Sequence, residues 1–174
     1  AERQWGLTML QLLQDEFGAV YYKKGNHENR LEHYMLRNAP AVYDDELMTL
    51  EHILNFEGSK INFIHDAQII EFGKLRIMHG HEIRGGGFVN TARNKYLKSY
   101  SNILFAHHHQ VNESYVKDLD GKYEGAWSIG CLCQMSMGYA PVNQWMHGFA
   151  EVKRSDDKGS FRVYNHKIID GKVC

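Results

Sequence analysis

The chain has 174 residues, of which 43% are hydrophobic and 24% are charged, and these proportions are ordinary for a globular domain. Its formal net charge of −1 excludes a general electrostatic attraction to nucleic acids or anionic membranes, although a local basic patch stays compatible with it. No apolar run approaches the roughly 20 residues of a membrane-spanning helix, and no secretion signal is visible. We therefore expect residues 1–174 to form a single soluble, cytoplasmic domain without a membrane partner.

The first part of the chain predicts helices around a short strand at 19–23. Gly18 is a plausible stop for the helix before this strand, and the strand leads into a loop, Gly25-Asn26-His27-Glu28. Pro40 breaks the helix after the loop, and Asp44 is a suitable N-cap for the next one. Helices are expected over 2–16, 28–37 and 44–54.

The rest of the chain predicts a mostly β structure with one helix, over 88–100. The solvated outer face of this helix would carry Arg93, Lys95 and Lys98. Asp120-Gly121 is a strong turn signal for a hairpin between two of the strands. Strands are expected at 61–64, 67–72, 75–78, 102–106, 111–117, 122–129, 132–137, 149–152 and 161–169.

Three cysteines, Cys131, Cys133 and Cys174, form an odd count without the pattern of a disulfide framework. This usage indicates a reducing compartment. The Cys-x-Cys pair leaves two interpretations open. It is a metal-binding pair or, as we expect, a pair of small side chains buried in a strand.

Eleven histidines are the unusual feature of the composition, and six of them lie in three motifs. The motifs are Gly25-Asn26-His27-Glu28, His79-Gly80-His81 and His107-His108-His109, and each follows an apolar run that predicts a strand. Ligands gather at strand ends in open α/β sheets, and neutral imidazole is the commonest metal ligand. We therefore predict a metal-dependent hydrolase. No special role is expected for the remaining histidines, which are His33, His52, His65, His147 and His166.

In their order and strand context, the three motifs resemble those of the calcineurin-like metallophosphoesterases, with His107-His108-His109 in the place of Gly-His-x-His. The resemblance covers most of the chain. It implies an α/β fold in which two mixed β-sheets form a sandwich flanked by helices. It also implies hydrolysis of phosphomonoesters or phosphodiesters with two divalent metal ions, which would be manganese, iron or zinc.

By this resemblance, Asn26, His79 and His107 would bind one ion, and His109 would bind the other. His27 would stabilise the transition state and protonate the leaving oxygen. Alternate residues of an extended segment face the same side, so we expect His107 and His109 to point into the site and His108 to point away.

The family also carries an Asp-x-His and a Gly-Asp-x-x-Asp motif upstream of the first of these motifs, and neither is present here. The first strand–helix–strand unit of the fold would be missing with them. Three explanations are open: an N-terminally truncated chain, which we favour, a degenerate member that binds without hydrolysing, and carboxylates supplied from another chain. Without a bridging carboxylate, we expect the chain to hold at most one ion firmly and to hydrolyse phosphoesters poorly.

The sequence does not define the substrate beyond a phosphoester, and nucleotides and nucleic acids are among the candidates. The first motif also resembles that of the serine/threonine protein phosphatases. Those enzymes carry His-Gly-Gly where this chain has His79-Gly80-His81, so this activity is the second choice. A non-catalytic binding module on the same scaffold is the alternative from another functional class.

Overall fold

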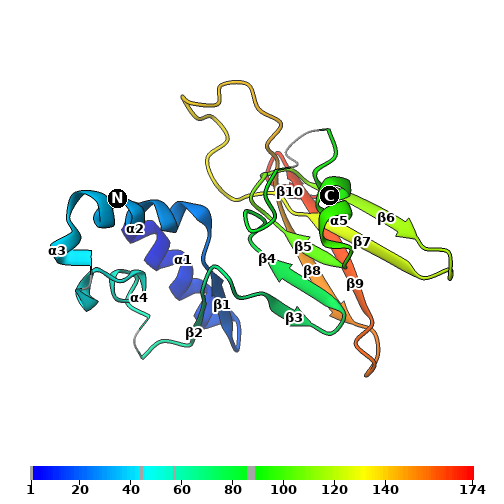
Figure 1. Ribbon diagram of the computed structural model, residues 1–174, viewed down its shortest axis with the longest axis horizontal. Helices are drawn as coiled ribbons and strands as arrows, with labels where there is room; N and C mark the ends of the chain where they lie inside the picture. The colour runs from blue at the N-terminus through cyan, green and yellow to red at the C-terminus, as the bar shows by residue number, and fades with distance from the viewer. Residues whose placement is uncertain (1, 44, 57, 86–88) are drawn as a thin grey trace. The chain divides into compact units, whose positions relative to one another are not determined.

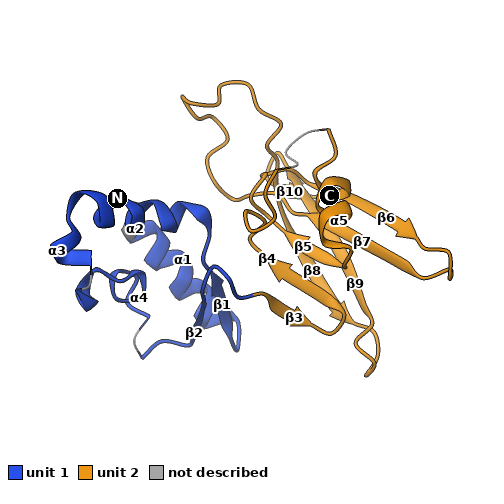
Figure 2. Ribbon diagram, in the orientation of Figure 1, with its two compact units in different colours: residues 1–68 blue, residues 69–174 orange. Residues whose placement is uncertain are grey.

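Helices gather in the first part of the chain and strands in the second (Figure 1). The structure, a computed structural model, describes residues 2–43, 45–56, 58–85 and 89–174. The chain divides into two compact units, 1–68 and 69–174 (Figure 2). The predicted α/β class with mixed sheets is confirmed, whereas a single domain over 1–174 stays a prediction. Within the described residues, no helix combines the length and the apolar character that crossing a bilayer requires.

The first unit combines helices with a two-stranded parallel sheet, formed by β1 (Val20–Lys23) and β2 (Ile61–Ile64). The rings of Tyr22, Phe56 and Phe63 meet at centroid distances of 5.3, 5.7 and 6.0 Å and form its aromatic core. The helices are α1 (Glu2–Glu16), α2 (Asn26–Asn38), α3 (Pro40–Tyr43), the 3-10 helix η1 (Glu46–Met48) and α4 (Leu50–Ile53).

The continuous helix predicted over 44–54 is wrong, because the structure has a series of short turns there. The side chain of Asp45 accepts a hydrogen bond from the N–H of Leu47 and begins η1. Thr49 likewise accepts from the N–H of His52 and begins α4. Each cap starts a new helix and so interrupts the previous one. Asp44, the predicted cap, lies outside the described residues.

Among its described residues, the second unit contains one helix and two sheets. Its elements are β3 (Ile70–Phe72), β4 (Leu75–Met78), α5 (Thr91–Ser99), β5 (Ile103–Phe105), β6 (Asn112–Lys117), β7 (Tyr123–Ser128), β8 (His147–Arg154), β9 (Phe161–Ile169) and β10 (Lys172–Val173). The larger sheet has the order β3-β4-β5-β7-β6, and its three central strands run parallel between antiparallel edges. The smaller sheet, β10-β9-β8, is antiparallel.

The five-stranded sheet is covered by α5 on one face and by the smaller sheet on the other (Figure 1). On the helix side, Ile103 and Phe105 of β5 form a buried cluster with Tyr96 of α5. On the opposite side, Leu104 packs in a cluster that includes Val163 of β9. Because side chains alternate between the two faces along β5, this strand contributes to both buried clusters. Burial of one such side chain contributes roughly 1.5–3 kcal/mol.

Two close backbone approaches join the sheets of the second unit. Before β4, the N–H of Lys74 donates to the carbonyl oxygen of Gly159 over 2.9 Å, and a Cβ on Gly73 would lie 2.4 Å from that oxygen. After β7, a Cβ on Gly130 would lie 2.6 Å from the backbone nitrogen of Gly148. Only glycine permits these approaches, because a side chain at either position would collide with backbone.

Several sequence predictions in this unit differ from the structure. The strand expected over 132–137 is wrong: the chain between β7 and β8 leaves the sheets as a long loop (Figure 1), and Cys131 makes only an isolated bridge to His147. The helix expected over 88–100 begins at Thr91 because Asn90 caps it, and residue 88 lies outside the described residues. The strand expected over 67–72 is shorter, and β10 was not predicted.

Candidate metal centre

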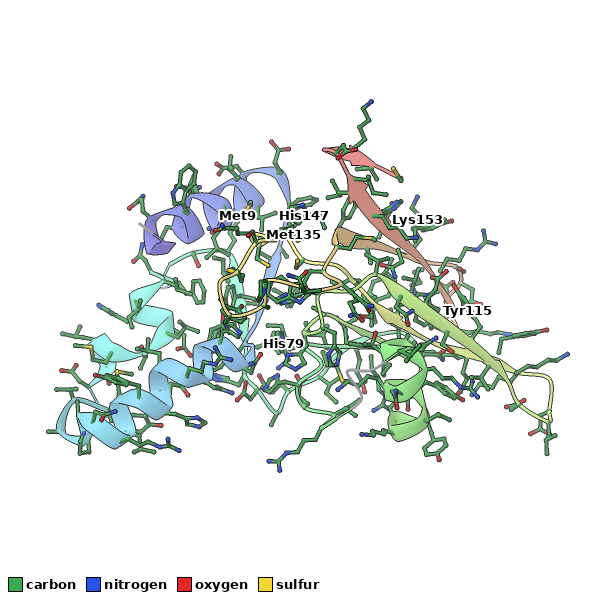
Figure 3. The ribbon with its side chains drawn as sticks, turned by 90° about the horizontal axis from the view of Figure 1, so that it is seen from above. Met9, His79, Tyr115, Met135, His147 and Lys153 are labelled. Carbon is green, nitrogen blue, oxygen red and sulfur yellow. The ribbon has the colours of Figure 1, made fainter. Side chains whose placement is uncertain are left out.

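Two histidine motifs meet at one edge of the five-stranded sheet. Strands β4 and β5 run parallel, with Met78 opposite Phe105, so the residues that follow them leave the sheet side by side. The N–H of Ala106 donates to the carbonyl oxygen of His79 over 3.0 Å and fastens the two connections together. This is the strand-end arrangement that the sequence predicted for His79 (labelled in Figure 3) and His107.

The imidazoles of His79 and His107 form the centre of this group. Nε2 of His79 lies 3.2 Å from Nδ1 of His107. Two imidazole nitrogens on one tetrahedral ion, with bonds of about 2.0–2.1 Å, stand about 3.3 Å apart. The same distance also suits an N–H···N hydrogen bond, in which one ring donates and the other accepts. The ring of His81 lies 5.0 Å from that of His79.

The environment keeps His107 in the form that a metal ion requires. Burial, together with the neighbouring His79 and His108, lowers the pKa of His107 to about 4. At neutral pH its ring is therefore uncharged, and only a neutral imidazole has a lone pair to offer a metal ion. Burial likewise lowers the pKa of His108, with Lys95 and His109 contributing.

A carboxylate and an amine, neither of them predicted as site residues, hold the loop that carries His79. The carboxylate of Glu82 accepts hydrogen bonds from the N–H groups of His79 at 3.2 Å and Gly80 at 2.6 Å. The ammonium of Lys95 donates to the carbonyl oxygens of Gly80 at 2.9 Å and Ile83. The anionic Glu82 therefore binds N–H groups of this loop, and the cationic Lys95 binds carbonyl oxygens of the same loop.

The outward position predicted for Lys95 is wrong, because its side chain is only 1% exposed. Its helical neighbours pack on the sheet, and the two carbonyl oxygens replace the water that its ammonium would otherwise bind. Burial lowers the pKa of Lys95, Lys98 adds to the lowering, and Glu82 opposes it.

The tripeptide His107-His108-His109 is not extended. His107 and His109 have φ angles of 57° and 58°, in the left-handed region that non-glycine residues seldom adopt. The expected alternation of faces therefore does not apply. His107 turns toward His79, whereas the ring of His109 lies 4.5 Å from that of Trp145, and its Nδ1 lies 3.9 Å from Sγ of Cys133.

His108 lies between these two, with its ring 4.9 Å from that of His107 and 6.2 Å from that of Phe105. Its Nε2 is buried and has no hydrogen-bond partner within the described part of the chain. His108 therefore packs beside the histidine pair, between His107 and Phe105.

Asn26 and His27 belong to the first unit, in the first turn of α2, which begins two residues earlier than predicted. Gly25 is the extended N-cap of this helix, and Glu28 fixes the turn through both carboxylate oxygens. One oxygen accepts from the Gly25 N–H at 3.0 Å, and the other accepts from the Tyr22 hydroxyl at 2.8 Å. Burial raises the pKa of Tyr22, and the charge of Glu28 raises it further.

Of the predicted site residues, the structure thus brings His79 and His107 together, and it places His109 in the same unit beside cysteines. Asn26 and His27 share a helical turn in the other unit. Glu82 could have been noticed in the sequence, because it is the acidic residue directly after the second histidine motif. No local signal pointed to Lys95, whose partners lie on a loop far from it in sequence.

A cavity of about 420 Å³ lies elsewhere in the second unit, lined among others by Lys74, Tyr115, Trp127 and Arg162. Lys74 precedes β4 whereas His79 follows it, so this cavity belongs to the opposite edge of the sheet.

Comparison of the chain with protein-family profiles, curated proteins and solved structures gave no match.

Proposed function

We propose that the protein is a metal-dependent phosphoester hydrolase with the fold of the calcineurin-like metallophosphoesterases. The observation that carries the proposal is the 3.2 Å separation of Nε2 of His79 and Nδ1 of His107 at the ends of two parallel strands. This distance is that of two ligands on one ion. The helix–sheet–sheet layering of the second unit agrees with the expected sandwich.

His79 and His107 would hold the first of two divalent ions, manganese, iron or zinc. The resemblance would assign His109 to the second ion, but its ring lies beside Trp145 and Cys133. Such ions, when bound, neutralise phosphoryl oxygens and lower the pKa of a bound water. The donor set fits, since burial keeps the His107 ring neutral at physiological pH.

Other residues of the chain would hold a metal ligand in place and supply a proton to the leaving oxygen. Glu82 and Lys95 hold the backbone around His79, so that the imidazole keeps one orientation. In the other unit, α2 begins at Asn26 and offers the positive end of its dipole, which favours a phosphate. His27, exposed in the first turn, would donate its proton to the leaving oxygen.

A non-catalytic binding module is the second candidate, and one observation favours it. Glu82, the carboxylate nearest in sequence to the histidine pair, accepts two backbone N–H groups of its own loop. A bridging carboxylate is the natural way to hold two cations together, and Glu82 is committed to a structural task. On this alternative, one ion would bind at the histidine pair without hydrolysis.

The two candidates are separated by measuring metal content and turnover together. The chain is stripped with chelator, loaded with Mn²⁺ and assayed with an aryl phosphodiester, beside His79→Ala and, as a control on an exposed histidine, His33→Ala. We expect weak turnover that requires Mn²⁺, disappears in His79→Ala and persists in His33→Ala. Stoichiometric binding without turnover would support the binding module, and absence of both would reject the two candidates.

A further inference from the structure

We propose that His109, Cys131 and Cys133 form a thiolate metal site suited to Zn²⁺, distinct from the His79–His107 pair. One nitrogen of His109 and the two Sγ atoms all lie within 4.8 Å of one another, and all three residues are half-buried. The resemblance to metallophosphoesterases gives His109 no thiol partners. The proposal stands whether or not the protein hydrolyses phosphoesters.

The spacing of the three donor atoms is close to that of a filled site. With Zn–S bonds of about 2.3 Å and Zn–N bonds of about 2.0–2.1 Å, tetrahedral geometry places two sulfurs about 3.8 Å apart and a sulfur and a nitrogen about 3.5 Å apart. Sγ of Cys133 lies 3.9 Å from Nδ1 of His109. Small rotations of the thiol side chains would therefore close the three donors around an ion.

The backbone around the cluster is held on both sides by one segment, 145–148. The N–H of Cys131 donates to the carbonyl of Met146 at 3.0 Å, and the N–H of Met146 donates to the carbonyl of His109 at 2.8 Å. Nε2 of His147, labelled in Figure 3, lies 2.8 Å from the carbonyl oxygen of Cys133. Because a common segment bonds to all three donors' backbones, the donors are placed before any ion arrives.

The imidazole of His109 is also fixed from its side. The ring of Trp145 meets it edge-on, with centroids 4.5 Å apart and planes at 72°. The left-handed backbone at His109, with φ of 58°, turns this ring away from the direction that an extended chain would give it. Sequence alone would not pair His109 with the cysteines, since the pairing depends on this turn.

The donor set selects the class of metal. Two thiolates and an imidazole favour zinc or another borderline or soft ion over manganese, magnesium or calcium. The two thiolate charges also balance a dication, which the neutral His79–His107 pair does not. Three protein ligands leave a fourth position for water or a small ligand.

The test is a titration of the reduced, chelator-treated chain with Co²⁺, which substitutes for zinc and reports thiolate bonds by charge-transfer absorption. We expect one Co²⁺ per chain with this absorption, displaced by Zn²⁺. Cys133→Ser and His109→Ala should weaken binding by roughly tenfold or more, since even outer-shell partners are worth about that much. Cys174→Ser, a control on an exposed cysteine outside the cluster, and His107→Ala should keep the signal.

A second measurement needs no variant and so covers the case in which a substitution prevents folding. Counting reactive thiols in the wild-type chain should give three without metal and one after addition of Zn²⁺, because Cys131 and Cys133 become protected. No thiolate absorption, no protection by Zn²⁺, or equal affinity in Cys133→Ser would overturn the proposal. A Cys131–Cys133 disulfide that persists in reductant, seen as a mass lower by two hydrogens, would overturn it as well.

Discussion

Nζ of Lys95 lies 2.9 Å from the carbonyl oxygen of Gly80, and this buried bond holds the loop that carries His79. Replacing Lys95 with Met keeps most of the side-chain volume but removes the donor that the carbonyl oxygens of Gly80 and Ile83 share. We expect the free energy of unfolding to fall by about 1–3 kcal/mol, measured by urea denaturation.

Lys98→Met is the matched control, because Lys98 bonds a carbonyl on the exposed surface of the same region. Its effect should stay within about 0.5 kcal/mol, as for most surface substitutions. An equal loss in both variants would mean that helix α5, and not the loop, is what the substitutions disturb.

His107 and His108 are neighbours with different expected tasks. His107→Ala removes one of two nitrogens that stand 3.2 Å apart, so the affinity for Mn²⁺ or Zn²⁺ at this pair should fall by roughly tenfold or more. His108→Ala should leave the affinity nearly unchanged. The comparison is made by calorimetric titration of variants that also carry Cys131→Ser, which removes one thiolate of the His109–Cys131–Cys133 site. Equal losses in both variants would show that His108 is a ligand too.

Tyr22 should stabilise the first unit in a pH-dependent way. Tyr22→Phe removes the bond to Glu28 and should cost about 1–2 kcal/mol at neutral pH. Tyr21→Phe, on the neighbouring residue that is 59% exposed, should cost little. A Tyr22→Phe variant as stable as the wild type would show that the bond contributes nothing.

The sign of the pH effect follows from the raised pKa of Tyr22. The unfolded chain releases this proton near pH 10, whereas the folded chain retains it, so the contribution is complete below about pH 10 and declines as the pH rises above that value. The stability difference between wild type and Tyr22→Phe, measured by urea denaturation, should therefore stay constant up to about pH 10 and shrink as the pH rises above it.

Gly130 should not tolerate a side chain. In Gly130→Ala, the Cβ would lie 2.4 Å from the carbonyl oxygen of Met146, which also accepts the N–H of Cys131. The backbone would have to shift, and we expect the free energy of unfolding to fall by about 1–3 kcal/mol. Gly138→Ala is the control, because among the described residues no atom beyond its two chain neighbours lies within 4 Å of the position that its Cβ would take. Thermal unfolding curves of the two variants make the test.

His27 should act in turnover and not in metal binding. In the Mn²⁺-loaded chain, His27→Ala should lower kcat by about 10²–10⁴-fold for a substrate with a poor leaving group, because that oxygen needs a proton. The loss should shrink for a nitrophenyl ester, whose leaving group needs none. His33→Ala, an exposed residue of the same helix, is the control. Unchanged turnover of the poor substrate would remove His27 from the mechanism.

The sequence predicted well where a local pattern determines structure. The apolar run at 75–78 became β4, and the turn signal at Asp120-Gly121 became the β6–β7 hairpin, with Gly121 at φ of 80°. The histidines after β4 and β5 met because parallel neighbouring strands end at the same edge. These features depend on periodicity and on turn chemistry, which are visible over a few residues.

The failures have a common physical cause, which is that long-range contacts override local character. Lys95 reads as a surface residue because lysine prefers water, but carbonyl groups of a distant loop bind its ammonium. Residues 132–137 have the composition of a strand, yet a strand needs a partner for its backbone. The thiol partners of His109 follow from a left-handed turn that no pattern of side chains announces.

The two glycine approaches also determine how the second unit would respond to force. Gly73 meets Gly159 before β4 starts, and Gly130 meets Gly148 after β7 ends, so the two sheets are held together at opposite ends of the parallel strands. If one sheet slid over the other, both glycine contacts would have to break together, because the backbones there are in direct contact. The sandwich should therefore resist shear as a single body, and the sheet edge that carries His79 and His107 should keep its shape under load.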